Sequence, residues 1–178
     1  DSRWVVKGRT SICIRSCIAV LCVVLITACS AQPEPNAADR TFVSEMVAHH
    51  QLGMTMVESA VLRSDDVRLR KLVFEMQSYH GHELHQLSSH LQKWNIDEAK
   101  VFPGFIEPIR LEKIDQLTGP AYDKAWIFAM IEHHEGAVEI GKNQLLAGNA
   151  PDLISLAKKV VVTQQTEILE MKKILSSE

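Results

Sequence analysis

The chain has few of the residues that build disulfide-linked or turn-rich folds. Its 178 residues include only four cysteines, eight glycines and six prolines. Three of the cysteines fall within residues 1–28, so the remainder of the chain holds Cys29 alone and has no pair to form a disulfide bond. Stability must therefore come from packing. The scarcity of glycine and proline argues against a turn-rich β architecture and favours helices.

Basic residues are also scarce once residues 1–28 are set aside. That segment holds four of the 19 Lys and Arg residues and one of the 22 acids, which leaves 15 basic against 21 acidic residues, a net charge of −6. No basic stripe remains, so we expect no nucleic-acid partner. A mildly acidic domain suits cations better than anions.

The apolar run CIAVLCVVLITA, at residues 17–28, is too short for a membrane-spanning helix of about 20 residues. It follows a basic start and ends in small residues, the order that is typical of an export signal. LITAC resembles a bacterial lipobox, which implies removal of 1–28 and lipid attachment at Cys29; a plain secretory signal or an uncleaved anchor is the alternative. We expect a membrane-anchored lipoprotein that faces the periplasm or the cell exterior, with residues 29–38 as a tether.

An internal repeat dominates the rest of the chain. MVAHH at 46–50 and MIEHH at 130–134 coincide when the sequence is shifted by 84 residues, and the register persists without a gap from 39 to 91. Chance would not maintain that register, so the chain contains a duplicated unit. The matched pairs include Asp39 with Asp123, Met46 with Met130, His49 with His133, His50 with His134 and Glu83 with Glu167.

Each repeat predicts a helical hairpin. Apolar residues recur at three- and four-residue steps along 42–60 and 69–91, which is the spacing of one helix face. RSDD at 63–66 and AGNAPD at 147–152 indicate the turns, and Asp39 and Asp123 are candidate N-caps. We expect helices near 39–62, 66–93, 121–147 and 151–176, with a short helix near Ile109–Leu117.

The two hairpins define the organisation of the chain. Residues 39–93 form the first hairpin, 94–121 a long crossover and 122–178 the second hairpin. Neither hairpin buries its apolar face alone, so we predict that they pair about a pseudo-twofold axis into an all-α four-helix bundle.

Polar residues interrupt the apolar faces. His49 and Glu83 lie there in the first repeat, and an unpaired buried carboxylate costs several kcal/mol, so it needs a proton, a cation or a metal. With the first turn centred near residue 64 or 65, Met46 is predicted level with Glu83, and His49 level with His80. The second hairpin repeats this arrangement, with Gln164 in place of His80.

The mixture of donor types points to copper. Thioether sulfur is soft and imidazole is borderline, and together they suit copper, above all Cu(I), whereas zinc prefers histidine and carboxylate. Taken singly, a methionine is more often core packing and a buried histidine more often bonds a neighbour, but the duplicated Met-x-x-His-His motif favours metal binding. An exposed histidine patch could be added by His82, His85 and His90. The candidate ligands are Met46, His49, His50, Met54, Met56, His80, Glu83, Met130, His133, His134 and Glu167.

Three segments resemble the domain of unknown function 305 family: DRTFVSEMVAHHQLGMTM (39–56), YDKAWIFAMIEHHEGAVEI (122–140) and QQTEILEM (164–171). The resemblance covers nearly all of 36–175. It implies a ferritin-like four-helix bundle, typically exported, with members tied to copper binding and copper tolerance. The ligands it carries over are Met46, His49, His50, Met56, Met130, His133 and His134.

The two repeats differ at candidate ligand positions. Ile140 stands where the first repeat has Met56, and Gln164 stands where it has His80. The second repeat is therefore expected to bind metal more weakly, or only to support the first.

The function predicted from these features is copper binding for sequestration, tolerance or transfer, with another divalent metal as an alternative. A ferritin-like dimetal enzyme would need four carboxylates and two Glu-x-x-His pairs, whereas the helix faces offer two carboxylates and the reversed order His80-x-x-Glu83. We therefore expect no enzyme. A structural bundle with His–Glu pairs and no metal is the remaining alternative, and a homodimer or a copper-delivery partner is left open.

Overall fold

The computed structural model describes residue 2 and residues 34–177, so the expected signal segment and the predicted lipid-attachment residue Cys29 lie outside the part described. Within that part the chain is all-α, as predicted, and contains no strand. The predicted helix bounds are met within two residues. The helices are α1 (Ala37–Arg63), α2 (Val67–Lys93), α3 (Pro108–Asp115), α4 (Gly119–Ala147) and α5 (Pro151–Ser176). None of the helices described is both long and apolar enough to cross a membrane.

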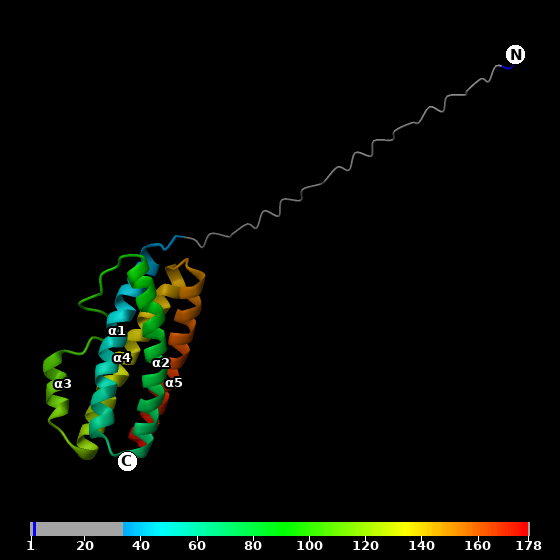
Figure 1. Ribbon diagram of the computed structural model, residues 1–178. Helices are drawn as coiled ribbons and strands as arrows, with labels where there is room; N and C mark the ends of the chain where they lie inside the picture. The colour runs from blue at the N-terminus through cyan, green and yellow to red at the C-terminus, as the bar shows by residue number, and fades with distance from the viewer. Residues whose placement is uncertain (1, 3–33, 178) are drawn as a thin grey trace. The chain divides into compact units, whose positions relative to one another are not determined.

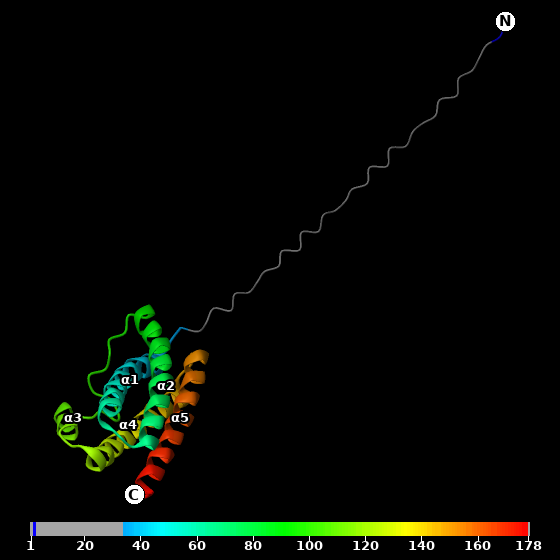
Figure 2. The same cartoon turned by 60° about the horizontal axis from the view of Figure 1, so that its bottom comes forward.

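Four long helices pack side by side, as Figure 1 shows, and α3 lies outside them in the crossover. The hairpins α1–α2 and α4–α5 are joined by contacts of α1 with α4 and of α2 with α5, while α3 rests on α4 (Figure 2). Neighbouring helices run antiparallel. The start of α1 meets the end of α4, where Asn36 Nδ2 donates to the Ala147 carbonyl at 2.8 Å, and Arg68 near the start of α2 donates to Ser177 beyond α5.

The N-caps differ from those predicted. Asn36 caps α1, and its side chain accepts from the backbone N–H of Asp39, whose carboxylate accepts from the Asn36 N–H in return. Asp39 is thus the third residue of a capping box rather than the cap itself. Asp123 is not a cap either, because α4 begins earlier, after Thr118, and leaves Asp123 inside the helix. Asp66 caps α2 by accepting from two backbone N–H groups.

Two apolar clusters fill the bundle, one toward each end. The first includes Met56, Met76, Trp126 and Met130. The second includes Phe42, Met46, Leu87 and Ile140. Full burial of side chains of this size stabilises the fold by about 1.5–3 kcal/mol each. In α1, α2 and α5 buried polar positions separate the residues of one cluster from those of the other, and α4 carries buried polar residues that contact them, so a polar layer crosses the bundle between the clusters.

Candidate metal centre

The polar layer consists of eight side chains, each at most 8% exposed. Every long helix contributes two of them, because each sequence repeat carries a histidine pair on its first helix and a polar pair on its second. Seven of the eight are predicted ligands, and the eighth is an amide. The members are His49, His50, His80, Glu83, His133, His134, Gln164 and Glu167.

Two histidine–glutamate pairs occupy equivalent positions in the repeats. His50 Nε2 lies 2.8 Å from Glu83 Oε2, and His134 Nε2 lies 2.8 Å from Glu167 Oε2. The predicted match of Met46 with Glu83 is therefore wrong by one helical turn. Side chains on a helix lean toward its N-terminus, so in an antiparallel hairpin the side chains that meet come from positions farther along both helices than the backbone register indicates.

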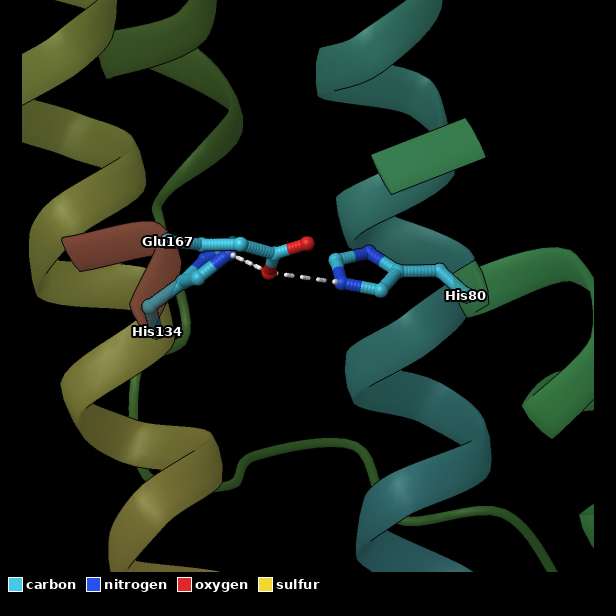
Figure 3. A group of neighbouring side chains, drawn as sticks. All are labelled: His80, His134 and Glu167. Carbon is cyan, nitrogen blue, oxygen red and sulfur yellow. Dashed lines mark hydrogen bonds and ion pairs between the residues drawn. The ribbon is translucent and has the colours of Figure 1, made fainter. Parts of the chain in front are cut away.

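A third histidine joins the two hairpins. His80 Nε2, from α2, lies 3.3 Å from Glu167 Oε2 and 3.1 Å from Gln164 Nε2 on α5. Figure 3 shows the Glu167 carboxylate between the rings of His80 and His134. The ligand atoms of these three residues all lie within 4.8 Å of one another. Two imidazoles and a carboxylate at this spacing are a three-ligand set of the kind that holds zinc or copper.

The remaining histidines of the layer, His49 from α1 and His133 from α4, stack on each other. His49 and His133, which are equivalent in the repeat, have ring centroids 3.7 Å apart and planes 12° from parallel. His49 Nε2 lies 2.8 Å from the His133 carbonyl. His133 Nδ1 in turn lies 2.8 Å from the carbonyl of Gly104 in the crossover. The crossover therefore contributes directly to the layer.

Two glycines bring the crossover close enough for that hydrogen bond. A Cβ on Gly136 would lie 2.3 Å from the backbone of Pro103 and Gly104, so only glycine at this point of α4 admits the crossover. Gly104 itself has φ +77°, a conformation that other residues rarely adopt. The sequence analysis did not predict this contact, although a glycine inside an apolar helix pattern is a signal of close backbone approach.

The hydrogen bonds assign the tautomers of four histidines. His50 and His134 donate Nε2–H to carboxylates, His49 donates Nε2–H to a carbonyl, and His133 donates Nδ1–H to one. The opposite nitrogen of each ring then carries a lone pair, and each is buried without a hydrogen-bond partner among the described residues. These atoms are His49 Nδ1, His50 Nδ1, His133 Nε2 and His134 Nδ1.

Such nitrogens fit a metal. A buried acceptor with no partner costs about 1–3 kcal/mol, and coordination removes that cost. Histidines that bind metals nearly always donate their other N–H to a carboxylate or a backbone carbonyl, which orients the ring. All four of these histidines make such a bond.

The electrostatics of the layer keep four of its imidazoles neutral. Burial lowers the pKa of His49, His50, His133 and His134, and repulsion between neighbouring imidazoles adds to the effect for His133, whose pKa falls to about 3. Burial raises the pKa of Glu167, but the hydrogen bonds from His134 and His80 outweigh it and bring that pKa to about 2. At neutral pH these four imidazoles are therefore uncharged and the Glu167 carboxylate is ionised, the protonation states that binding of a metal cation requires.

The predicted methionines flank the layer. Met46, Met56 and Met130 are at most 1% exposed and belong to the apolar clusters, whereas Met54 is half-buried. Met46 and Met130 each precede a histidine pair by one helical turn. Their thioethers are thus close along the helix to the imidazoles, and their role as ligands stays a prediction.

The predicted histidine patch is separate from the layer. His82 and His85 are exposed, and His90 is partly buried. His90 Nε2 pairs with Asp152 at 3.2 Å, and its ring packs against Trp94 with centroids 4.7 Å apart.

Fold and site together define an all-α protein whose bundle encloses a histidine–carboxylate layer suited to metal. The chain belongs to the domain of unknown function family DUF305, whose sequence profile matches residues 39–175. No curated protein sequence matches the chain.

Solved structures share this fold. A DUF305 fragment from Deinococcus radiodurans has a TM-score of 0.74 at 24% identity and covers 82% of this chain and 100% of that one. A DUF305 protein from Streptomyces coelicolor, described as secreted, has a TM-score of 0.72 at 24% identity, over 79% and 93% of the two chains. CopM in its Cu(I)-bound form has a TM-score of 0.69 at 22% identity, over 78% and 96%. CopM is also known in Cu(II)-bound and Ag-bound forms.

Proposed function

We propose that this protein binds copper in the buried layer and serves to sequester it, confer tolerance to it or transfer it. The observation that carries the proposal is the set of four neutral imidazoles, each with an unpartnered buried nitrogen, beside carboxylates that accept from the opposite side of two rings. Layers of this composition are costly to bury without a cation.

The donor types favour copper over zinc. His80, His134 and Glu167 alone suit either Zn(II) or Cu(II). Thioether sulfur one turn away, on Met46 in the first repeat and Met130 in the second, adds the soft donor that Cu(I) prefers. The similar fold of CopM, solved with Cu(I), Cu(II) and Ag, supports this choice.

The bundle topology supports a ferritin-like assignment. α1 and α2 are antiparallel, a long crossover leads to α4, and α4 runs antiparallel to α1. Two antiparallel hairpins joined by one long crossover are the arrangement of ferritin-like bundles. In ferritin-like dimetal enzymes, four carboxylates and two histidines supply the metal ligands. The layer of this protein has only two carboxylates, so we assign metal binding rather than catalysis.

Export and lipid attachment at Cys29 complete the proposal. The basic start, apolar run and LITAC ending motivate it, and the Streptomyces coelicolor relative described as secreted supports export. Labelling with a radioactive fatty acid tests it, since Cys29→Ala should abolish incorporation; continued labelling of that variant would contradict lipid attachment.

Thermal unfolding with and without metal tests the binding site. A metal that binds only the folded protein stabilises it by about 2.7 kcal/mol at a hundredfold excess over Kd. We expect Cu(I) to raise the melting temperature more than Zn(II), and His49→Ala combined with His50→Ala to remove most of that rise. Met46→Leu should weaken Cu(I) selectively and leave Zn(II) little changed.

A variant of the second repeat supplies the comparison. Ile140 and Gln164 stand where the first repeat has Met56 and His80, but His134 lies with His80 and Glu167 in the three-ligand set, so His133→Ala combined with His134→Ala should also remove most of the copper effect. An undiminished Cu(I) shift in the His49/His50 variant would place the site elsewhere. No shift with any metal in the wild-type protein would favour a purely structural bundle.

A further inference from the structure

A groove of about 800 Å³ runs between α2 and α5 on the outside of the bundle. These two helices make the fewest contacts of the four neighbouring pairs of long helices, and they lie side by side in Figure 1. The walls carry Tyr79, His82 and Glu83 from α2, and Lys158, Lys159 and Thr163 from α5. Glu83 is also a member of the polar layer, so the groove connects the solvent with one side chain of the layer.

A second groove, of about 730 Å³, lies between the same two helices. It is the counterpart of the first under the 84-residue repeat, because Leu72, Glu75, Thr166 and Glu170 in its wall correspond to Leu156, Lys159, His82 and Gln86 in the first. Its wall contains no member of the polar layer. The duplication therefore produced two grooves, of which one reaches the layer.

The two carboxylates of the layer also differ in their hydrogen-bond partners and in their exposure to solvent. Glu167 Oε2 lies within hydrogen-bond distance of both His134 Nε2 and His80 Nε2, and its side chain is 7% exposed. Glu83 accepts from His50 alone, and its side chain is 11% exposed. Glu83 thus has capacity for a further ligand on the side that faces the groove.

Glu83 is the outermost of a series of neighbouring side chains that can bind a metal ion and that lead into the bundle. Its Oε2 is 2.8 Å from His50 Nε2, and the His50 ring lies 5.1 Å from the His80 ring between centroids. His80 is 3.3 Å from Glu167, which bonds His134. A cation that leaves water at Glu83 therefore has the His50 ring, whose lone pair is on Nδ1, and then His80 and Glu167 along its way into the layer.

From these observations we infer that the groove at Glu83 is the portal through which the metal ion passes between solvent and the buried layer. The inference rests on the proposed function, and it assigns to Glu83 the transfer of the ion from the groove to His50. Lys158 and Lys159, both exposed on the α5 side of the groove, repel a free cation and set a barrier at the mouth.

Narrowing the portal tests the path. Gln86 lies one turn from Glu83 in the groove wall and is exposed, so Gln86→Trp narrows the mouth without entering the core. Glu170→Trp introduces the same side chain at the equivalent exposed position of the second groove, where it also removes the ion pair of Glu170 with Lys173. Loading of Cu(II) is followed by stopped-flow quenching of tryptophan fluorescence, and release is followed after mixing with excess EDTA.

We expect Gln86→Trp to slow loading and release by the same factor, about tenfold for a barrier raised by about 1.4 kcal/mol, and to leave Kd unchanged. Glu170→Trp should retain the wild-type rates. Unchanged rates in Gln86→Trp, or equal slowing in both variants, would overturn the portal. A wild-type protein that takes up no Cu(II) would instead remove the proposed function itself.

Charge at the mouth gives an independent test. Lys158→Glu with Lys159→Glu should accelerate Cu(II) loading by about tenfold or more at low ionic strength, through attraction of the cation, and high salt should abolish the gain. Lys71→Glu with Lys173→Glu changes the net charge equally but in the second groove. The same acceleration in this control would show a general effect of protein charge and would contradict the portal.

Discussion

At the scale of single residues, glycine determines whether the crossover reaches the layer. Gly136 lies in α4, where alanine would ordinarily stabilise the helix by about 1 kcal/mol. Its place against Pro103 and Gly104 leaves no room for a methyl group. The contact also positions the Gly104 carbonyl that accepts from His133 Nδ1. The absence of a side chain at Gly136 therefore matters both for the packing of the crossover and for the candidate site.

We therefore expect Gly136→Ala to destabilise the protein by about 1–3 kcal/mol, the usual cost of overpacking, despite the gain in helix propensity. Gly81→Ala is the matched control, since it lies in α2 and a Cβ there would meet no atom within 4 Å. That variant should be stabilised by up to about 1 kcal/mol. Urea unfolding measures both changes, and stabilisation by Gly136→Ala would refute the close approach.

At the scale of elements, one buried carboxylate holds the start of α1 against the α4–α5 turn. Asp39 is 0% exposed and accepts from Gln144 Nε2 at 2.6 Å, and from the backbone N–H groups of Asn149 and Ala150 at 3.2 Å each. The equivalent residue in the second repeat, Asp123, is also buried, but its Oδ1 has no hydrogen-bond partner among the described residues. The repeat thus preserved the residue and not its contacts.

Substitution by alanine should separate these two residues. Asp39→Ala leaves several buried donors without an acceptor, at about 1–3 kcal/mol each, so we expect a loss of at least about 2 kcal/mol in the free energy of unfolding. Asp123→Ala should cost clearly less, because fewer bonds are lost. Chemical denaturation of the two variants side by side checks the difference; equal losses would contradict the unequal roles.

At the scale of the whole molecule, the layer couples stability to pH. Burial lowers the pKa of four histidines below the usual 6.5, to about 3 for His133. The unfolded chain therefore binds protons that the folded protein does not, and folding is weakened as pH falls below 6.5, by up to about 1.4 kcal/mol per histidine and pH unit. Glu167, with a pKa lowered from 4.5 to about 2, adds stability that is lost as pH falls from 4.5 to 2.

We expect the metal-free protein to lose stability steadily between pH 7 and pH 5 in urea titrations. His50→Gln should flatten that dependence by about one proton, because one titrating group is removed. A free energy of unfolding that stays constant over this range would show that the layer is not held in its neutral form.

The sequence predicted most of this architecture and part of the site. Periodicity located the long helices because each buries one face. The repeat together with the position of His80 on its helix face identified every titratable member of the layer. The sequence places Met46 level with Glu83, one helical turn before His50, because the backbone register does not include the lean of side chains toward the N-terminus of each helix. The sequence predicts Asp39 as a cap, whereas it is the third residue of the helix, because an aspartate at either position has a similar sequence signature. The contact of Gly104 with Gly136 was missed because a loop on a helix has no periodic pattern.

The meeting of His80 and Gln164 has an evolutionary consequence. These residues are equivalent in the repeat, and His80 Nε2 lies 3.1 Å from Gln164 Nε2. In an ancestor assembled symmetrically from two separate, identical hairpins, this contact would join two copies of one residue. Fusion of the hairpins into a single gene product freed each position to mutate alone, and a mixed imidazole–amide contact is an arrangement that no symmetric pair of hairpins can encode.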